Sequence, residues 1–278
     1  MKHAEFKFNT FDGLSLFGQS WQPEDRPRAV VCLVHGLREH SGRYVHVADS
    51  LIQAGYTLIS FDLRGHGKSE GPRGHTPSYG ALMKDISSLL EVANKQFPQL
   101  PFFLYGHSLG GNLVLNYVLR RRSHLKGVIA TAPWLRLAFE PPAFKIILGK
   151  ITNQLYPAFS QKSGLDTKVL SHDPEVVHAY ENDPLIHDHI SARMFIGIYQ
   201  SGHWALEHAL EFSLPLLLMH GGADKIISVE ASREFAGKIT ENCTFKIWDN
   251  LYHEIHNEPE KEEVFKFLID WLDKEVSK

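Results

Sequence analysis

Short apolar runs alternate with segments of helical periodicity along most of the chain. The clearest helical pattern covers residues 79–97, where apolar side chains recur every three or four positions. Six apolar runs have the length and composition of strands: residues 29–34, 56–61, 102–105, 127–131, 214–219 and 244–248. This alternation predicts a mostly parallel sheet with helices on both faces.

Residues 5–21 follow the two-residue period of a strand pair instead. Phe6 belongs to the first arm and Leu16 to the second, with an Asp-Gly pair at positions 12 and 13 between them. Asp-Gly is typical of tight hairpin turns. The segment therefore predicts a hairpin at the antiparallel edge, which makes an eight-stranded sheet.

The strand–helix alternation stops between residues 134 and 202. Nearly seventy residues here contain no clear core strand, which is too many for a plain loop. We expect a helical cap inserted after the fourth parallel strand. Residues 1–133 and 203–278 would then form the core domain, and residues 134–202 the cap.

One helical stripe in the predicted cap is strongly apolar. It consists of Phe144, Ile147, Leu148, Ile151 and Leu155, with polar side chains at most positions between them. Simple packing against the main domain is one interpretation. The more specific interpretation is that the stripe belongs to a lid that lines or gates an acyl tunnel. Such a lid would also make transient contact with a membrane or micelle.

Composition excludes some partners. The chain has 278 residues, 43% hydrophobic and 22% charged, with a net charge of −3, which fits one large α/β domain with an insertion. This charge gives no general attraction to nucleic acid. The three arginines at positions 120–122 are interpreted as the end of a helix, where cations complement the helix dipole.

The pentapeptide Gly-His-Ser-Leu-Gly at residues 106–110 carries the chemistry. It follows the apolar run at 102–105 and precedes a helical pattern, so Ser108 lies at a turn from strand to helix. This context is that of the nucleophile elbow of an α/β-hydrolase. Small glycines let the backbone turn sharply, and the start of a helix favours a developing oxyanion.

A serine nucleophile needs a base, and the base needs an orienting carboxylate. Asp224 follows the run at 214–219 and His253 follows the run at 244–248, in the order expected of this fold. Asp249 lies too near His253 along the chain to approach its imidazole from behind. His256 shares the loop and remains an alternative base.

Two backbone N–H groups are the predicted oxyanion donors. Leu109 directly follows the nucleophile, and Leu37 follows a His-Gly turn at the end of an early strand. A metal site is not expected, because the His-Asp-His triplet at residues 187–189 has no third patterned ligand.

Several motifs resemble one family closely. The segment at residues 35–44 is similar to the His-Gly-x-x-Glu-His-Ser-Gly-Arg-Tyr signature of monoacylglycerol lipases and bacterial lysophospholipases. Four further segments match that family in order and spacing: residues 62–71, 106–111, 221–224 and 252–258. The resemblance covers nearly the whole chain and is weakest in the cap.

This resemblance implies an α/β-hydrolase that cleaves carboxylic esters of long-chain fatty acids without a cofactor. It transfers the triad to Ser108, Asp224 and His253 and the oxyanion donors to Leu37 and Leu109. It also implies an alcohol pocket, formed by three polar residues: Glu39, Arg43 and His256. The alternative for Glu39 and Arg43 is an ordinary ion pair on a helix surface, because residues four apart in the sequence are neighbours there.

The predicted reaction is hydrolysis of long-chain monoacylglycerol to fatty acid and glycerol through a serine acyl-enzyme. Lysophospholipase or a broad medium-chain carboxylesterase is the alternative. A peptidase would need cap carboxylates to hold a free amino terminus, and Glu140, Glu175 and Glu181 show no such arrangement. A hydrolase-fold binding protein without turnover is disfavoured by the complete triad. The pattern indicates no oligomeric state.

Cysteine placement and hydropathy give the expected location. Cys32 and Cys243 fall on strands about four positions apart, roughly 19 Å at ~4.8 Å per strand, well beyond disulfide reach. The N-terminal residues lack an apolar signal core, and no apolar run reaches the ~20 residues of a membrane span. We expect a cytoplasmic protein, peripheral to membranes if the cap makes contact.

Overall fold

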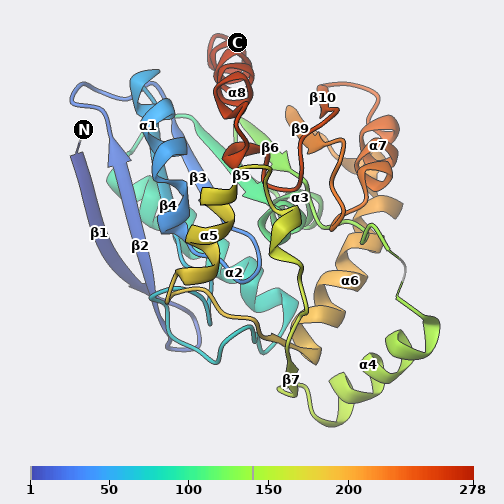
Figure 1. Ribbon diagram of the computed structural model, residues 1–278. Coiled ribbons are helices and arrows are strands. Elements are labelled where there is room, and N and C mark those ends of the chain that lie inside the picture. The colour runs from blue at the N-terminus through green and yellow to red at the C-terminus, as the bar shows by residue number, and fades with distance from the viewer. Residues whose placement is uncertain (1, 140) are drawn as a thin grey trace.

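The computed structural model describes residues 2–139 and 141–278. Within these residues, eight strands form one sheet in the order β1-β2-β4-β3-β5-β6-β9-β10 (Figure 1). The strands are β1 (Lys2–Asn9), β2 (Ser15–Gln22), β3 (Val30–Val34), β4 (Thr57–Phe61), β5 (Phe102–His107), β6 (Gly127–Thr131), β9 (Leu216–Gly221) and β10 (Cys243–Trp248). Two short strands, β7 (Ser160–Gln161) and β8 (Ile190–Ser191), pair separately in the cap.

The predicted mostly parallel sheet with an antiparallel edge is confirmed. β1 and β2 pair antiparallel, β2 pairs antiparallel with β4, and every later neighbour pair is parallel. The predicted tight turn is wrong, because Asn9 pairs with Ser15 and leaves a five-residue loop between them. Thr10 explains the longer loop: its hydroxyl donates to Asp12 and accepts from the N–H of Leu14.

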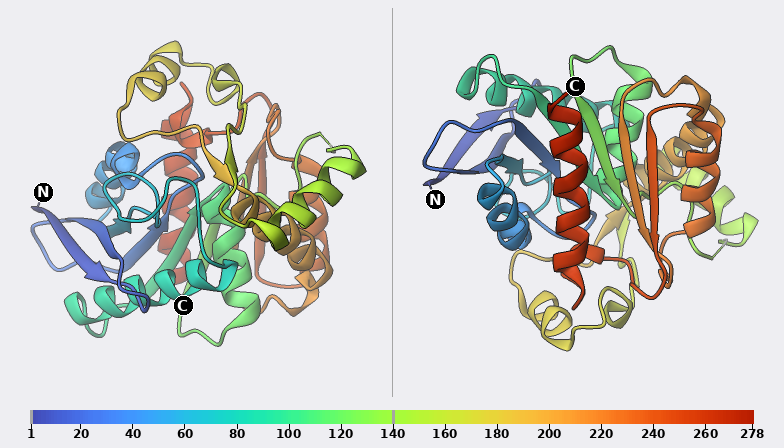
Figure 2. Two further views of the ribbon diagram at one scale, coloured as in Figure 1. Left: turned by 90° about the horizontal axis from the view of Figure 1, so that it is seen from below. Right: turned by 90° about the horizontal axis from the view of Figure 1, so that it is seen from above.

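Helices cover both faces of the sheet, as predicted. α1 and α8 pack on one face, and α2, α3 and α7 pack on the other (Figure 2). The helices are α1 (Val45–Gln53), α2 (Tyr79–Gln96), α3 (Leu109–Arg120), α4 (Ala143–Leu155), α5 (Pro174–Asn182), α6 (Ala192–Glu207), α7 (Val229–Lys238) and α8 (Lys261–Val276). Short 3-10 turns are η1 (Ser41–Tyr44), η2 (Thr167–Val169), η3 (Ala209–Glu211) and η4 (Ile255–Asn257).

The cap comprises α4, β7, η2, α5 and β8, which all lie between β6 and α6 in the chain. α4 stands away from the body of the molecule and packs mainly on α6 (Figure 1). The predicted boundary between residues 202 and 203 falls inside α6, which continues to Glu207. The reason is that α6 packs against the core helix α3 as well as α4, so one helix serves both parts.

Strand order also separates the two cysteines. Cys32 lies on β3 and Cys243 on β10, four positions apart in the sheet as predicted, and both thiols are free. Burial raises the pKa of both thiols, to about 11 for Cys243. Among the described residues, no helix is both long and apolar enough to cross a bilayer.

Candidate active site

Ser108 occupies a strained turn between the end of β5 and the start of α3. Its φ is +53°, in the left-handed region that residues with a side chain rarely adopt. A Cβ at Gly106 would overlap the carbonyl of Gly110, and one at Gly110 would overlap the carbonyl of Val34. The two glycines are therefore required by close backbone approach, as the pentapeptide predicts.

Asp224 and His253 meet at the carboxyl ends of β9 and β10. The Nδ1–H of His253 donates to Asp224 Oδ2 at 2.7 Å, and the other carboxylate oxygen accepts from the backbone N–H groups of Ile226 and Ile227. The Nε2 atom of His253 forms no hydrogen bond with a described residue. The imidazole is thus oriented from behind and has one nitrogen available to a reacting group.

The charges of this pair reinforce each other. Burial alone would raise the pKa of Asp224, but His253 and His220 hold it well below its usual range. Burial alone would lower the pKa of His253, yet the neighbouring Asp224 carboxylate outweighs it and raises that pKa above 6.5. Asp224 is therefore ionised at neutral pH and favours the imidazolium form of His253.

His220 is a site residue that the sequence analysis did not assign. Its Nε2 lies 3.0 Å from the same Asp224 oxygen that binds His253, and its Nδ1 lies 2.7 Å from Ser232 Oγ. The signal was present, because His220 precedes Asp224 by four residues at the end of the same strand. His220 is therefore a second histidine that holds the Asp224 carboxylate.

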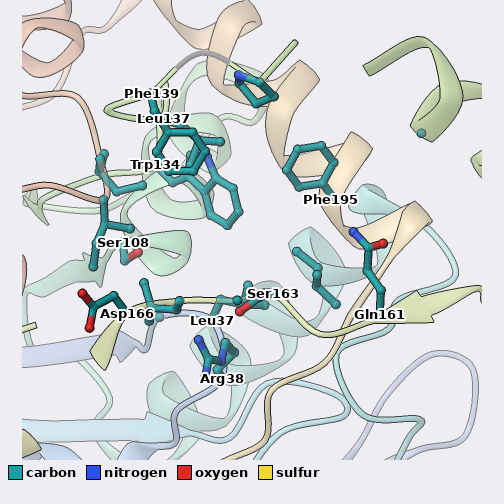
Figure 3. Close-up of a pocket in the computed structure, with 18 of the residues that line it drawn as sticks. Leu37, Arg38, Ser108, Trp134, Leu137, Phe139, Gln161, Ser163, Asp166 and Phe195 are labelled. Atoms are coloured by element: carbon teal, nitrogen blue, oxygen red, sulfur yellow. The ribbon is translucent and has the colours of Figure 1, made fainter. Parts of the chain in front are cut away.

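Leu37 and Leu109 both lie beside Ser108, where the predicted oxyanion donors are needed. Leu109 is the first residue of α3, so its N–H has no acceptor within the helix. Leu37 lines the cavity next to Ser108 (Figure 3). Gly36 N–H donates to Glu39 Oε1 at 2.6 Å, which fixes the turn that carries Leu37.

A cavity of about 960 Å³ opens above Ser108. Its walls are mainly apolar and come from both the core and the cap. Trp134, Leu137 and Phe139 lie above Ser108 in the close-up, and Phe195 of α6 lies across the cavity from it (Figure 3). Asp166 and Gln161 bring two polar side chains from the cap to the lining of the cavity.

The apolar stripe of α4 is divided between this cavity and the outer surface. Phe144 and Leu148 line the cavity. Ile147 and Ile151 do not line it, and their side chains are 57% and 47% exposed. The sequence analysis expected all four side chains to line or gate the tunnel. The apolar stripe of α4 is wider than the part of the helix that faces the cavity, so Ile147 and Ile151 lie outside the lining.

The three residues of the predicted alcohol pocket take different positions relative to the cavity. Glu39 lines the cavity, but neither Arg43 nor His256 does. Both oxygens of Glu39 already accept hydrogen bonds, one from Gly36 and Tyr44 and the other from Arg43. His256 is fully buried and its ring is stacked on Tyr44, and neither ring nitrogen has a hydrogen-bond partner among the described residues. These side chains bind and pack against protein rather than facing a leaving group.

In the described part of the cap, carboxylates suited to a free amino terminus do not gather at the cavity. Glu175 and Glu181 are on α5 and do not line the cavity, and Glu181 accepts from Thr167. Glu140 lies outside the described residues. Among the described residues, the acidic side chains that line the cavity are Glu39, Asp166 and Glu254.

The sheet, the serine at the strand–helix turn and the Asp–His pair behind a capped cavity define an α/β-hydrolase. Comparison with family models then places the chain within this class. The model described as serine aminopeptidase S33 matches residues 25–260, so the chain belongs to that family of hydrolases.

Individual relatives give a finer picture. The chain is 33% identical over 274 residues to a monoacylglycerol lipase of Mycolicibacterium smegmatis, covering 97% of this chain and 96% of that protein. The crystal structure of a monoacylglycerol lipase from Paleococcus ferrophilus superposes with a TM-score of 0.84 at 36% identity, over 99% of this chain and 100% of that one. An uncharacterized abhydrolase domain-containing protein of Dictyostelium discoideum is 37% identical over 96% of this chain, which spans only 28% of that protein.

Proposed function

We propose that this protein hydrolyses long-chain monoacylglycerols to fatty acid and glycerol through a serine acyl-enzyme. The observation that carries the proposal is the capped, largely apolar cavity that opens directly onto Ser108. Such a cavity suits an acyl chain, and the likeness to two monoacylglycerol lipases along their whole length supports glycerol as the alcohol. No cofactor is part of the proposal.

The proposed reaction has two displacement steps. Ser108 Oγ attacks the ester carbonyl while His253 Nε2 takes the hydroxyl proton, and the N–H groups of Leu37 and Leu109 bind the oxyanion. Collapse of the tetrahedral intermediate breaks the bond to glycerol, which leaves with the proton from His253. Water then attacks the acyl-enzyme by the same route and releases the fatty acid, while Asp224 stabilises the imidazolium in each half.

Acyl length should control the rate in this proposal. Each buried methylene is worth ~0.8 kcal/mol, which is about fourfold, so kcat/KM climbs with chain length until the cavity is full. A panel of monoacylglycerols, diacylglycerols, lysophospholipids and an aminopeptidase substrate tests it, with the Ser108→Ala variant as the blank. Preferred cleavage of long-chain monoacylglycerol is expected. Faster cleavage of any other class would overturn the assignment.

Lysophospholipase activity is the second candidate. Lys145 and Lys225 line the cavity, and neither forms an ion pair with a described residue. An ammonium on the cavity wall attracts the phosphate of a lysophospholipid headgroup. If this candidate is right, Lys225→Met lowers cleavage of the lysophospholipid more than that of the monoacylglycerol.

The cap forms part of the proposal as a lid that meets lipid surfaces. The outer side of α4 and the residue after it expose a set of large apolar side chains: Ile147, Ile151, Leu155 and Tyr156. An exposed apolar patch of this kind marks an interaction site. We place the protein in the cytoplasm with peripheral membrane contact, which the free thiols of Cys32 and Cys243 support.

A further inference from the structure

Three charged side chains form a buried cluster beside the proposed active site. The Arg43 guanidinium donates from Nη1 to Glu39 Oε2 at 2.8 Å and to Glu254 Oε1 at 2.8 Å. Its Nη2 donates to Glu254 Oε2 at 2.7 Å, which completes a bidentate pair. Relative exposure is 10% for the Arg43 side chain, 2% for Glu39 and 3% for Glu254. Such a planar, two-sided arrangement suits arginine and not lysine.

Each carboxylate in the cluster belongs to a different part of the catalytic machinery. Glu39 accepts the N–H of Gly36, and this bond fixes the turn whose next residue, Leu37, is the proposed oxyanion donor. Glu254 directly follows the proposed base His253 in the chain. Arg43 is therefore the link between the loop that binds the oxyanion and the loop that carries the base.

The cap closes over the same guanidinium. The ring of Tyr180, from α5, lies 4.8 Å from Arg43 Cζ, a distance at which a cation and an aromatic face attract each other. Tyr180 is 3% exposed and also lines the cavity. The cluster is thus a junction of three parts: the oxyanion loop, the base loop and the cap.

We propose that Arg43 is a positioning residue that holds the oxyanion loop and the base loop in register through Glu39 and Glu254. The inference rests on the proposed serine mechanism but not on the identity of the alcohol. It differs from an alcohol pocket in one decisive respect, since a positioning residue affects every ester equally.

The cluster also sets the charge around His253. Two carboxylates and one guanidinium leave one net negative charge, and Glu39 and Glu254 both add to the rise in the pKa of His253. Further titratable side chains near His253 are Asp224, which is ionised, and His107 and His256, whose pKa values burial lowers. Removing the positive charge of Arg43 leaves both carboxylates uncompensated and raises the pKa of His253 further.

The experiment measures kcat and KM against pH for Arg43→Met and Arg43→Lys. Substrates are a monoacylglycerol and a nitrophenyl ester of the same acyl chain. We expect Arg43→Met to lower kcat by about 10²-fold on both esters with little change in KM, because misplaced catalytic groups affect the chemical step. The acid limb of its profile moves to higher pH by ~0.5–1 unit. Arg43→Lys keeps the charge but loses the bidentate geometry. Its kcat should therefore be about tenfold higher than that of Arg43→Met, and the acid limb of its pH profile should lie where the wild-type limb lies.

A double variant separates the charge from the geometry. Arg43→Met/Glu254→Gln restores the net charge of the cluster, so its acid limb returns toward the wild-type position while kcat stays low. Arg28→Met is the matched control, since Arg28 pairs with Asp273 on the surface, where both side chains are more than 40% exposed. Its kcat and pH profile remain those of the wild type.

Two results would overturn the proposal. One is a loss confined to the glycerol ester, which would return Arg43 to an alcohol pocket. The other is an Arg43→Lys variant, folded by near-ultraviolet circular dichroism, with wild-type kcat on both esters. Labelling by a fluorophosphonate probe reports on Ser108 without any natural substrate. If the wild type labels and cleaves nitrophenyl esters but no monoacylglycerol, the proposed function fails while the role of Arg43 is still tested.

Discussion

The two sides of the cavity differ in how their side chains are held. On the sheet side, Ser108, Asp224 and His253 are each no more than 9% exposed. The carboxylate of Asp224 alone receives hydrogen bonds from two histidines and two backbone N–H groups. On the cap side, Phe144 and Leu148 line the cavity yet remain 64% and 59% exposed.

This contrast separates two kinds of residue. Polar groups on the sheet side act through direction and distance, so the loss of one atom removes a defined step. Apolar groups on the cap side contribute to substrate binding in proportion to the apolar surface area that they bury, so each one contributes a small amount. Substitutions on the sheet side should therefore abolish turnover, whereas those on the cap should alter substrate preference.

The largest effects are expected for the nucleophile and the base. Ser108→Ala and His253→Ala each lower kcat by about 10⁴–10⁶-fold with the fold intact, and the double variant costs little more. Steady-state turnover of the glycerol ester measures kcat, and circular dichroism shows that the fold is intact. Substantial activity in His253→Ala, with loss in His256→Ala, would make His256 the base.

Asp224→Asn is expected to lower kcat by about 10⁴-fold. Activity requires neutral His253, whose pKa is raised by Asp224, so the wild-type rate falls as the pH drops through a value above about 6.5. Loss of the carboxylate lowers that pKa, and the acid limb moves to lower pH. An acid limb that stays in place would show that another group controls the profile.

Matched substitutions on α4 test the division of its stripe. Leu148→Asp, inside the cavity, should lower kcat/KM for long-chain esters by about 10-fold or more relative to acetate esters. Ile147→Asp, on the outer side, should leave soluble esters unchanged and weaken activity on vesicles or micelles. Equal losses for both variants on soluble esters would mean that the stripe is ordinary packing.

The smallest effect concerns the two thiols. Cys32 is fully buried in the middle of the sheet, whereas Cys243 at the edge is partly exposed. Cys243 should react first with a thiol reagent in the native protein, and Cys32 only on unfolding. Mass spectrometry of the timed reaction measures both rates. A bridge between the two in the folded monomer would contradict the strand order.

Sequence reasoning succeeded where local rules decide the structure. The run that became β6 was predicted to the residue, and Ser108 fell at the predicted turn, because strands and elbows depend on short stretches of chain. Sequence reasoning failed where the contacts of a side chain come from residues far away in the sequence. No sequence pattern near Arg43 indicates that its guanidinium binds Glu254, which lies more than two hundred residues later in the chain. The end of the cap was missed for a related reason, since only packing on α3 shows why α6 continues past residue 202.

The continuity of α6 restricts how the molecule can open. Asn112 and Asn116 of α3 donate to the Ile198 and Ser201 carbonyls of α6, so α6 is tied to the helix that begins directly after Ser108. Bending α6 to swing the whole cap would disturb Ser108 itself. α4 rests mainly on α6 and buries little else, so its local unfolding free energy should be low. We therefore expect opening motions to occur in α4 before α6, so that the entrance of the cavity fluctuates while the catalytic side chains keep their geometry.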